Sequence, residues 1–330
     1  MFNGKVILIT GGTGSFGKQC TEMILSKYKP EKLIIFSRDE LKQHEMRQKF
    51  PDDGSMPIRY FIGDVRDKDR LKRAFADVHI VIHAAALKQV PTAEYNPFEA
   101  VKTNIMGAQN VIDASIDNNV EKVIALSTDK AANPVNLYGA TKLCSDKIFI
   151  AGNSYTGKRV KTIFSVVRYG NVLGSRGSVI PFFMEKRKTG ILPVTDSRMT
   201  RFWITLEQAV EFVFNSLSKM TGGELFVPKL PSMNIMGLAK VICPECKIKI
   251  VGIRPGEKLH EIMIPLDESR MAVEFEDSYI IQPHFSFYQT SGKQLGGKRV
   301  NDNFEYSSGT NSWFLSVKEM TEMISSGSIK

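Results

Sequence analysis

Four side chains that can exchange protons lie close together in the stretch TDKAANPVNLYGATK, residues 128 to 142. Asp129 and Lys130 are an adjacent acid and base, and Tyr138 and Lys142 are spaced to share one face of a helix. A carboxyl and an amine can act as general acid and base, and an ammonium beside a tyrosine favours the phenolate. The stretch is therefore a candidate site for proton-transfer chemistry.

A structural role accounts for part of the same stretch. It follows the apolar run VIALS, so an Asp near its start could cap a helix, and Asn133-Pro134 favours a turn. Asp129 and Lys130 could also be a surface ion pair, which would contribute little to stability. We favour the catalytic interpretation because the pair follows a central strand, and ligands bind at the carboxyl edge of such sheets.

The first half of the chain alternates short apolar runs, rich in β-branched residues, with polar segments typical of helices. This alternation predicts βαβ units, right-handed crossovers and a parallel sheet covered on both faces. The predicted fold is therefore α/β, a Rossmann-type doubly wound sheet. The expected strands are residues 5–10, 32–37, 58–63, 79–85, 122–127 and 161–168.

The pattern becomes irregular and richer in Gly, Pro and Arg after residue 170. We expect a cofactor-binding Rossmann domain over residues 1–170 and a smaller C-terminal substrate-binding region over residues 171–330. The run ELFV at 224–227 could return to the main sheet, so the two parts are expected to interleave.

Composition places the chain among ordinary globular proteins, with 330 residues of which 42% are hydrophobic and 24% charged. No apolar stretch approaches the roughly 18 residues of a membrane helix, and the N-terminus runs directly into a strand, so we expect a cytoplasmic protein. The net charge of +9 could suit nucleic acid. We favour a small polyanionic ligand, because the basic residues are scattered and the cluster EKRK at 185–188 is typical of a solvated helix end.

The four cysteines do not form a disulfide framework typical of small secreted proteins in a chain of this length. Cys243 and Cys246 form a CPEC motif, but a zinc site would need a second pair of ligands, and no matching pair is nearby. We predict a plain surface turn there and no metal site.

The segment ITGGTGSFGKQ places three glycines in a G-x-x-G-x-x-G spacing between the first expected strand and the first helix. Glycine allows a tight turn and close approach of the backbone, and a helix N-terminus offers free N–H groups to a pyrophosphate. We therefore predict a dinucleotide-binding turn. Its predicted contacts are Gly11, Thr13, Gly14, Ser15, Phe16 and Gly17.

The end of the second expected strand distinguishes NAD from NADP. An acidic residue there would bind the ribose 2′-hydroxyl of NAD, whereas Ser37 and Arg38 offer a hydroxyl and a cation to a 2′-phosphate. NADP is the predicted cofactor, although Asp39 and Glu40 follow closely. His83, at the end of the fourth strand, is expected to be structural. The other predicted cofactor contacts are Lys42, Asp64, Val65, Ala84, Ala85, Ala86, Lys88, Tyr138 and Lys142.

With these features in this order, the chain resembles the extended short-chain dehydrogenase/reductase family of nucleotide-sugar enzymes over nearly its whole length. More narrowly, SRDELKQ, STDKAANPVNLYGATKL, RYGNVLGSRGSVIPFF, MTRFWIT and GIRPGEKLHE are similar to the inverting UDP-N-acetylglucosamine 4,6-dehydratases of pseudaminic acid and surface-glycan pathways. Related dTDP-glucose dehydratases carry Asp-Glu where this chain has Asp129-Lys130, and retaining relatives often carry Met in place of Tyr138. The resemblance thus favours the inverting branch.

The resemblance implies a dehydration through transient oxidation. Tyr138 would take the proton of the sugar's 4-hydroxyl while NADP⁺ takes the hydride from carbon 4. A 4-keto sugar has an acidic proton at carbon 5, so Lys130 as base and Asp129 as acid would eliminate water. The hydride would return to carbon 6, with inversion at carbon 5, to give UDP-2-acetamido-2,6-dideoxy-β-L-arabino-hex-4-ulose. Lys130 must lose its proton for this role, which requires desolvation or a cationic neighbour such as Lys142 or the nicotinamide.

The resemblance also implies contacts with the UDP sugar. Arg201 and Arg254 offer forked cations to the two phosphates and Glu257 could accept from ribose hydroxyls, with structural ion pairs as the alternative for each. The predicted substrate contacts are Lys88, Asn171, Arg201, Arg254 and Glu257. Relatives assemble as dimers or larger rings, so a homo-oligomer, either a dimer or a hexamer, is expected. Neither nucleic acid nor a membrane is an expected partner.

Other functions remain open on the same fold. A retaining dehydratase would differ in product stereochemistry, and a UDP-sugar 4-epimerase would return the hydride to carbon 4. An NADP-binding sensor would keep the fold without the chemistry. The pair Asp129-Lys130 argues against simple epimerisation, and the presence of Tyr138 and Lys142 as well argues against a sensor.

Overall fold

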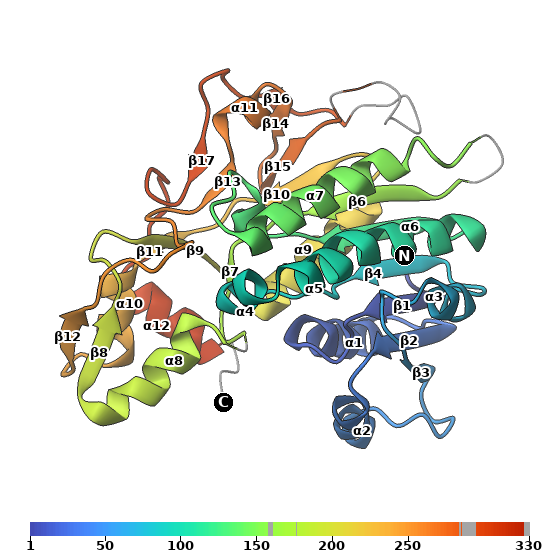
Figure 1. Cartoon of the computed structure of the whole chain (residues 1–330), viewed down its shortest axis with the longest axis horizontal. Coiled ribbons are helices and arrows are strands. Elements are labelled where there is room, and N and C mark those ends of the chain that lie inside the picture. The colour runs from blue at the N-terminus through green and yellow to red at the C-terminus, as the bar shows by residue number, and fades with distance from the viewer. Residues whose placement is uncertain (158–160, 176, 284, 286–294, 327–330) are drawn as a thin grey trace.

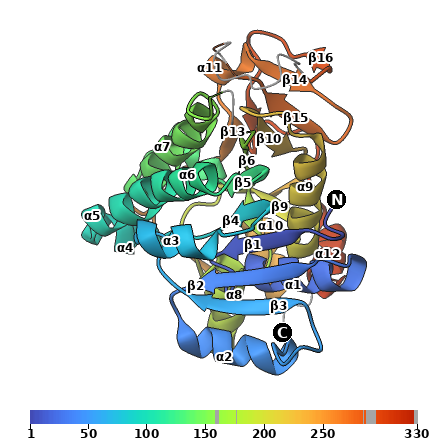
Figure 2. The same ribbon diagram turned by 90° about the vertical axis from the view of Figure 1, so that its right-hand side faces the viewer.

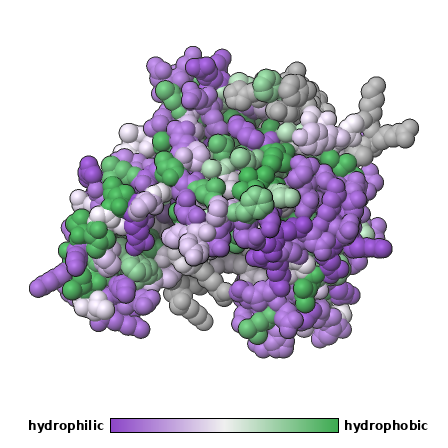
Figure 3. Space-filling view, in the orientation of Figure 1, coloured by the Kyte–Doolittle hydropathy of each residue, from purple (hydrophilic) through white to green (hydrophobic). Residues whose placement is uncertain are grey.

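The computed structural model describes residues 1–157, 161–175, 177–283, 285 and 295–326. Within these residues the chain forms a large sheet covered by helices and a smaller lobe beside it (Figure 1). Hydrophilic residues predominate on the face seen in Figure 1, where hydrophobic residues form separate smaller patches (Figure 3). No helix in the described part of the chain is both long and apolar enough to cross a membrane.

The central sheet has ten strands in the described residues, in the order β16-β14-β15-β10-β6-β5-β4-β1-β2-β3. The seven strands from β10 to β3 run parallel, and the other three continue the sheet antiparallel. Their bounds are β1 (Val6–Thr10), β2 (Lys32–Ser37), β3 (Ile58–Ile62), β4 (Ile80–His83), β5 (Lys122–Leu126), β6 (Ile163–Val167), β10 (Leu225–Pro228), β14 (Ala272–Glu274), β15 (Ser278–Ile281) and β16 (Lys298–Arg299).

Helices cover both faces of this sheet, with α3, α6 and α7 on one side and α1 and α9 on the other (Figure 2). Burial on both faces explains why a strand such as β1, VILIT, is apolar throughout instead of alternating. The helical segments around the sheet are α1 (Ser15–Lys27), α2 (Glu40–Lys49), α3 (Lys68–Ala74), α4 (Val90–Tyr95), α5 (Pro97–Val101), η1 (Lys102–Met106), α6 (Gly107–Asp117), η2 (Asp129–Ala131), α7 (Leu137–Gly152) and α9 (Leu206–Lys219).

The lobe is built from chain segments on either side of β10, and it has an apolar core of its own. Its elements are α8 (Val179–Lys186), η3 (Arg187–Thr189), β8 (Ile191–Val194), α10 (Ile235–Ile242), β12 (Lys247–Ile250) and α12 (Val317–Ser326). The segments that join it to the sheet are β7 (Asn171–Val172), β9 (Thr200–Ile204), β11 (Ser232–Asn234), β13 (Ile262–Ile264), α11 (Leu266–Ser269) and β17 (Tyr306–Ser307).

The six predicted strands are confirmed as β1 to β6, and the run ELFV does return to the sheet as β10 beside β6. The return explains the interleaving: the chain leaves the sheet after β6, contributes to the lobe, and comes back through α9. This helix begins with a capping box in which Thr205 and Gln208 each accept from the other's backbone N–H. The cluster EKRK is, as predicted, at the exposed end of α8.

The prediction for Cys243 and Cys246 was only partly right. The turn is present, with the Cys246 N–H donating to the Cys243 carbonyl, but the two side chains form a disulfide. Cys243 is also buried, because it directly follows α10 and packs with that helix's apolar side in the lobe core. The motif therefore serves as an internal crosslink at the end of α10 instead of a plain surface turn.

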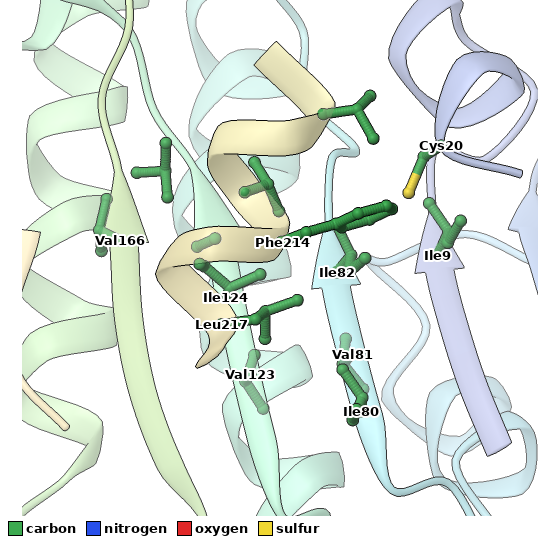
Figure 4. Packing of buried hydrophobic residues seen from close by; sticks show 14 of the residues in the cluster. Ile9, Cys20, Ile80, Val81, Ile82, Val123, Ile124, Val166, Phe214 and Leu217 are labelled. Atoms are coloured by element: carbon green, nitrogen blue, oxygen red, sulfur yellow. The ribbon is translucent and has the colours of Figure 1, made fainter. Parts of the chain in front are cut away.

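Phe214 of α9 is the aromatic side chain that packs this helix against the sheet. It is 5% exposed and lies among Ile9, Ile82 and Cys20 (Figure 4). Its ring also meets Phe2 and Tyr28, with centroids 4.8 and 6.0 Å away. The side chain thus joins the N-terminal segment, the central strands and α9.

We expect Phe214→Ala to lower the free energy of unfolding by about 3–5 kcal/mol, because it leaves a cavity between α9 and the sheet. Urea denaturation followed by circular dichroism measures the change. Tyr155→Ala is the control, since Tyr155 is 55% exposed and its removal should change stability by about 0.5 kcal/mol or less. Equal effects of the two substitutions would contradict the assigned packing.

Candidate active site

A cleft of about 1490 Å³ lies between the carboxyl ends of the sheet strands and the lobe. Its lining includes every residue that the sequence predicts for the site except Asp129. Sheet loops supply Gly11 and Ala85, α7 supplies Tyr138, and the lobe supplies Phe182 and Pro193. The cleft lies where the order of the parallel strands reverses between β1 and β4, as expected for a ligand site of a doubly wound sheet.

The glycine-rich turn between β1 and α1 has no room for side chains. Gly11 has φ +64°, and a Cβ there would lie 2.9 Å from the Ala85 backbone. A Cβ on Gly17 would lie 2.3 Å from the Gly12 carbonyl oxygen. Gly14 is the N-cap of α1 and brings no side chain to the first N–H groups of the helix. This cradle fits a dinucleotide pyrophosphate, which needs close backbone approach and N–H donors.

At the end of β2 the acidic side chain is engaged by other groups, whereas the basic side chain is partly exposed. Asp39 caps α2 by accepting from the Lys42 N–H at 3.0 Å, and it also pairs with the Lys42 ammonium. These contacts, led by the Lys42 ammonium, lower the pKa of Asp39. Arg38 is half exposed at 3.5 Å from Asp64, and Ser37 Oγ accepts from the Gln43 amide at 3.0 Å. Ser37 and Arg38 both line the cleft, so a hydroxyl and a guanidinium are accessible to a ligand there.

Tyr138 and Lys142 lie on the buried face of α7 and both line the cleft. Asn136 starts this helix by accepting from the Gly139 N–H at 2.8 Å. Burial raises the pKa of Tyr138 to about 12, against the effects of the Lys130 charge and a hydrogen bond with Thr128. Burial lowers the pKa of Lys142, and the Asp146 carboxylate opposes this. The expected tyrosine–lysine pair is in place, but the burial of Tyr138 works against the phenolate.

His83 is, as predicted, an internal residue. It is buried, and its Nδ1 is 2.8 Å from the Thr10 hydroxyl, which ties β4 to β1. Burial, together with the Lys142 charge, lowers the His83 pKa to about 3, so the imidazole is neutral. The loop after β4 is held by Asn104. Its side-chain amide accepts from the Leu87 N–H, donates to the Leu87 carbonyl and donates to the Thr141 hydroxyl at 3.0 Å. These contacts fix the Ala84–Ala86 floor against α7.

Asp129 and Lys130 form a buried cluster and not a surface ion pair. Asp129 is fully buried behind Lys130, whose ammonium donates to Asp129 Oδ1 at 3.0 Å. The Thr128 hydroxyl donates to the same oxygen at 2.9 Å. Lys130 also lies 3.3 Å from Glu261 and 3.5 Å from the Asn171 amide oxygen. A continuous path therefore runs from Tyr138 through Thr128 and Asp129 to Lys130.

Lys130 is desolvated, as its expected role as a base requires, but the charges nearest to it are carboxylates and not the expected cationic neighbour. Burial lowers the pKa of Lys130, but the carboxylates of Asp129 and Glu261 raise it by more, so the net shift is upward. For Asp129 the burial raises the pKa, the Lys130 charge lowers it, and Glu261 raises it again, with a net upward shift. The net effect of the cluster is thus to raise the pKa of both Lys130 and Asp129.

The predicted substrate residues occupy different environments. Asn171 and Lys88 line the cleft near Lys130. The pKa of Lys88 is lowered, mainly by burial and to a smaller extent by the Lys130 charge. Arg201 lines the cleft too, but it is buried and donates to the carbonyls of Thr200, Lys258 and Leu259. Arg254 is exposed at the cleft edge, 3.9 Å from Glu257. The motif GSRGS includes Arg176, which lies outside the described residues.

Sequence reasoning missed three polar residues of the site. Thr128 bridges Tyr138 and Asp129, Glu261 contacts Lys130, and Lys258 donates to the Ala132 carbonyl. Thr128 could have been found because it adjoins Asp129. Lys258 and Glu261 belong to the motif GIRPGEKLHE, but no local spacing in the sequence relates them to Lys130.

Residues 7–283 match the family described as polysaccharide biosynthesis protein. The inverting UDP-N-acetylglucosamine 4,6-dehydratase of Campylobacter jejuni (strain 81-176) is 58% identical, with 98% of each chain covered. The crystal structure of Pen from Bacillus thuringiensis shares 37% identity and a TM-score of 0.90, covering 100% of this chain and 99% of that one. DesIV of Streptomyces venezuelae, a dTDP-glucose 4,6-dehydratase solved with NAD, has a TM-score of 0.68 at 21% identity, covering 77% and 86% of the two chains.

We expect Gly17→Ala to displace the N-terminus of α1, because the added Cβ would overlap the Gly12 carbonyl. Affinity for a nicotinamide dinucleotide should fall at least about tenfold as the helix N–H groups move away from the pyrophosphate. Isothermal titration calorimetry measures this loss. Gly296→Ala is the matched control, since a Cβ there meets nothing within 4 Å. Unchanged affinity in Gly17→Ala would contradict the cradle.

Proposed function

The chain belongs to the polysaccharide biosynthesis protein family, of extended short-chain dehydrogenase/reductase fold, and from this premise we propose that it is an inverting UDP-N-acetylglucosamine 4,6-dehydratase. The observation that carries the proposal is the cluster of Tyr138, Asp129 and Lys130 at one end of a dinucleotide cleft. Oxidation at carbon 4 needs one proton acceptor, and loss of water needs an acid and a base besides. The cluster supplies all three.

We propose that the cleft binds a nicotinamide dinucleotide, NADP in preference to NAD. Asp39, the first acidic residue after β2, is engaged as the cap of α2 and as the partner of Lys42. Ser37 and Arg38 then offer the hydroxyl and the cation that suit a 2′-phosphate. A bound NADP⁺ would serve as the hydride acceptor for carbon 4, and its reduced form as the hydride donor for carbon 6.

Tyr138 acts first, as the acceptor for the proton of the sugar's 4-hydroxyl. With its pKa raised to about 12 by burial, it needs positive charge nearby to reach the phenolate. Lys142, which occupies the same face of α7, is the residue proposed to supply this charge. Thr128 also lowers the Tyr138 pKa, and its hydroxyl donates to Asp129, so it connects Tyr138 with the neighbouring cluster.

Asp129 and Lys130 then remove water. Lys130, as the free amine, takes the proton of carbon 5, the C5–H electron pair forms the C5=C6 bond, and the 6-hydroxyl leaves as water with a proton from Asp129. The products are an ammonium and a carboxylate, and the 3.0 Å between Lys130 Nζ and Asp129 Oδ1 lets them form an ion pair. Because Asp129 does not line the cleft, Thr128, which does, would pass its proton to the sugar.

The residues after position 170 are proposed to bind the UDP sugar. Asn171 lies beside Lys130 and is placed to contact the sugar, and Arg254 with Glu257 lies at the open edge, suited to phosphates and ribose. Arg201 donates to three backbone carbonyls, so we propose that it fixes the loop 258–261 in addition to its predicted contact with a phosphate. The family supports an assignment of the product to surface-glycan biosynthesis, of which pseudaminic acid is one case.

A homo-oligomer, either a dimer or a hexamer, is part of the proposal. The surface of α4, α5 and η1 supports it, since Tyr95, Phe98 and Met106 are 88%, 65% and 53% exposed within a short stretch. Large exposed side chains of this type are typical of association surfaces.

We expect the purified protein to convert UDP-N-acetylglucosamine in D₂O, with no added reductant, to a 4-keto-6-deoxy sugar carrying deuterium at carbon 5. Deuterium enters because the carbon 5 proton is lost to Lys130 and replaced from solvent. Proton NMR couplings of the L-arabino type would establish inversion. D-xylo couplings would assign the retaining reaction, a galacto isomer would assign an epimerase, and an unchanged substrate would overturn the proposed function.

We expect Arg38→Ala to weaken NADP binding by roughly 10- to 100-fold and to leave NAD binding nearly unchanged, because a charge-assisted hydrogen bond to the 2′-phosphate is lost. Calorimetric titration with both dinucleotides measures the ratio. Arg73→Ala, which removes an exposed arginine of α3 outside the cleft, should change neither affinity. Equal losses for NADP and NAD in Arg38→Ala would rule out a contact with the 2′-phosphate.

A further inference from the structure

Glu261 is a buried carboxylate beside the proposed base. Its side chain is 3% exposed and lines the cleft, and its Oε1 lies 3.3 Å from Lys130 Nζ and 3.6 Å from Arg201 Nε. Its backbone N–H donates to Ser308 Oγ at 2.9 Å, and its carbonyl accepts from the Ser308 N–H at 2.8 Å. These bonds, next to the β13–β17 pair, hold the carboxylate in place.

The two carboxylates that flank Lys130 are not equivalent. Glu261 contacts two cations, Lys130 and Arg201, whereas Asp129 forms an ion pair only with Lys130 in the described part of the chain. Two cations favour the ionised form more than one does, and Asp129 is also completely buried. The negative charge of the cluster therefore belongs mainly to Glu261, and a proton is held more easily by Asp129.

We propose that Glu261 is a positioning residue for the dehydration, which holds Lys130 in place as the base and, as the lasting anion of the cluster, keeps Asp129 in its acid form. This inference rests on the proposed dehydratase function. It adds a role for a residue that contacts neither reacting carbon and acts through the two residues that do the proton transfers.

The effect on Lys130 follows from the charge that the reaction creates. When the amine takes the proton of carbon 5 it becomes an ammonium, and Glu261 stabilises that charge at 3.3 Å. A buried carboxylate that orients a base and stabilises its protonated form has the role of the aspartate in a Ser-His-Asp triad. The upward net shift of the Lys130 pKa makes the amine a stronger acceptor for a weak carbon acid.

The effect on Asp129 has the opposite origin, since like charges repel. A second carboxylate across Lys130 makes ionisation of Asp129 less favourable and so preserves the acid that water formation needs. Arg201 limits the cost of keeping Glu261 charged, and Lys258 adds to this, because the charges of Lys130, Arg201 and Lys258 together outweigh burial and lower the Glu261 pKa. One carboxylate thus remains charged and the other protonated.

Charged and titratable groups reach this cluster from several elements, and all of them belong to its pH response. The loop before β13 brings Lys258 and His260, the loop after β4 brings Lys88, and α7 brings Tyr138, Lys142 and Asp146. The end of β6 brings Arg168, and β9 brings Arg201. Among the described residues, Asp129 and Glu261 are the two carboxylates that form ion pairs with Lys130.

The test compares pH profiles of kcat/KM for UDP-N-acetylglucosamine in the wild-type protein, Glu261→Gln and Glu261→Asp. Lys130 and Asp129 titrate as a pair, so a change of charge at Glu261 acts on the apparent pKa values of the pair in both limbs of the bell-shaped profile. Removal of the negative charge lowers both pKa values, and both limbs should move to lower pH by about one unit or more. The rate at the optimum should fall on the order of 100-fold. Glu261→Asp keeps the charge and should restore the wild-type limbs.

Glu224→Gln is the matched control for the loss of a buried carboxylate. Glu224 is also 3% exposed, but it accepts from Ser165, Thr221 and Gly222 away from the cleft. The Glu224→Gln variant should be less stable than the wild-type protein, but both limbs of its pH profile should stay at the wild-type positions. A Glu261→Gln profile that matches the wild-type profile after scaling would overturn the inference, because a structural role alone lowers the rate without moving either limb.

A second measurement needs no substrate and separates this inference from the proposed function. The infrared carboxylic-acid band of Asp129 is identified as the band that Asp129→Asn removes, and it is then titrated in wild type and Glu261→Gln. The band should disappear at lower pH in Glu261→Gln. An identical titration in both proteins would overturn the inference even if the enzyme is active. An inactive wild type with the expected shift would instead overturn the dehydratase function and retain the coupling of Glu261 to Asp129.

Discussion

Two carboxylates, Asp129 and Glu261, are buried at the floor of the cleft, and ionised groups persist in a protein interior only beside opposite charge. Lys130 lies between them, and Arg201 neutralises the outer side of Glu261. Among the described contacts, removal of Lys130 would leave Asp129 with no cation beside it, and removal of Arg201 would leave Lys130 to balance both carboxylates. The positions of η2, β9 and the loop before β13 are therefore fixed relative to one another by this charge balance as well as by apolar packing.

The topology of the sheet determines where these charged residues can meet. Parallel strands joined by helices put the ends of β1, β2, β4 and β5 on one edge, so the glycine turn, the Ser37–Arg38 pair and the Asp129–Lys130 pair all face one cleft. The return of the chain as β10 then brings β9 and the loop 258–261 over the same edge. Cofactor and proton-transfer groups thus meet because of topology, although they are far apart in the sequence.

The sequence predicts the parts of the site whose signal is local. The glycine spacing and the four-residue interval between Tyr138 and Lys142 each lie within one turn or helix, and both are where they were expected. Glu261 is 131 positions from Lys130, and its contact depends on how the lobe folds back, which no spacing reveals. The burial of Asp129 behind Lys130 and the bonding of Arg201 to three carbonyls are likewise tertiary outcomes. The turn at Cys243 was predictable, but its disulfide and its burial were not.

The presence of Glu261 also explains why position 130 carries a lysine. With an acidic residue there, as in the Asp-Glu pair that resembles this site in dTDP-glucose dehydratases, three carboxylates would lie within a few ångströms. Arg201, at 3.6 Å from Glu261, would be the one cation of the three ion pairs left at the site, so ionisation of all three carboxylates would be strongly disfavoured. A cation at 130 resolves this repulsion, and the same cation, once it has given up its proton, becomes the base. The choice of an amine as the base therefore follows from the charge of a residue in another part of the chain.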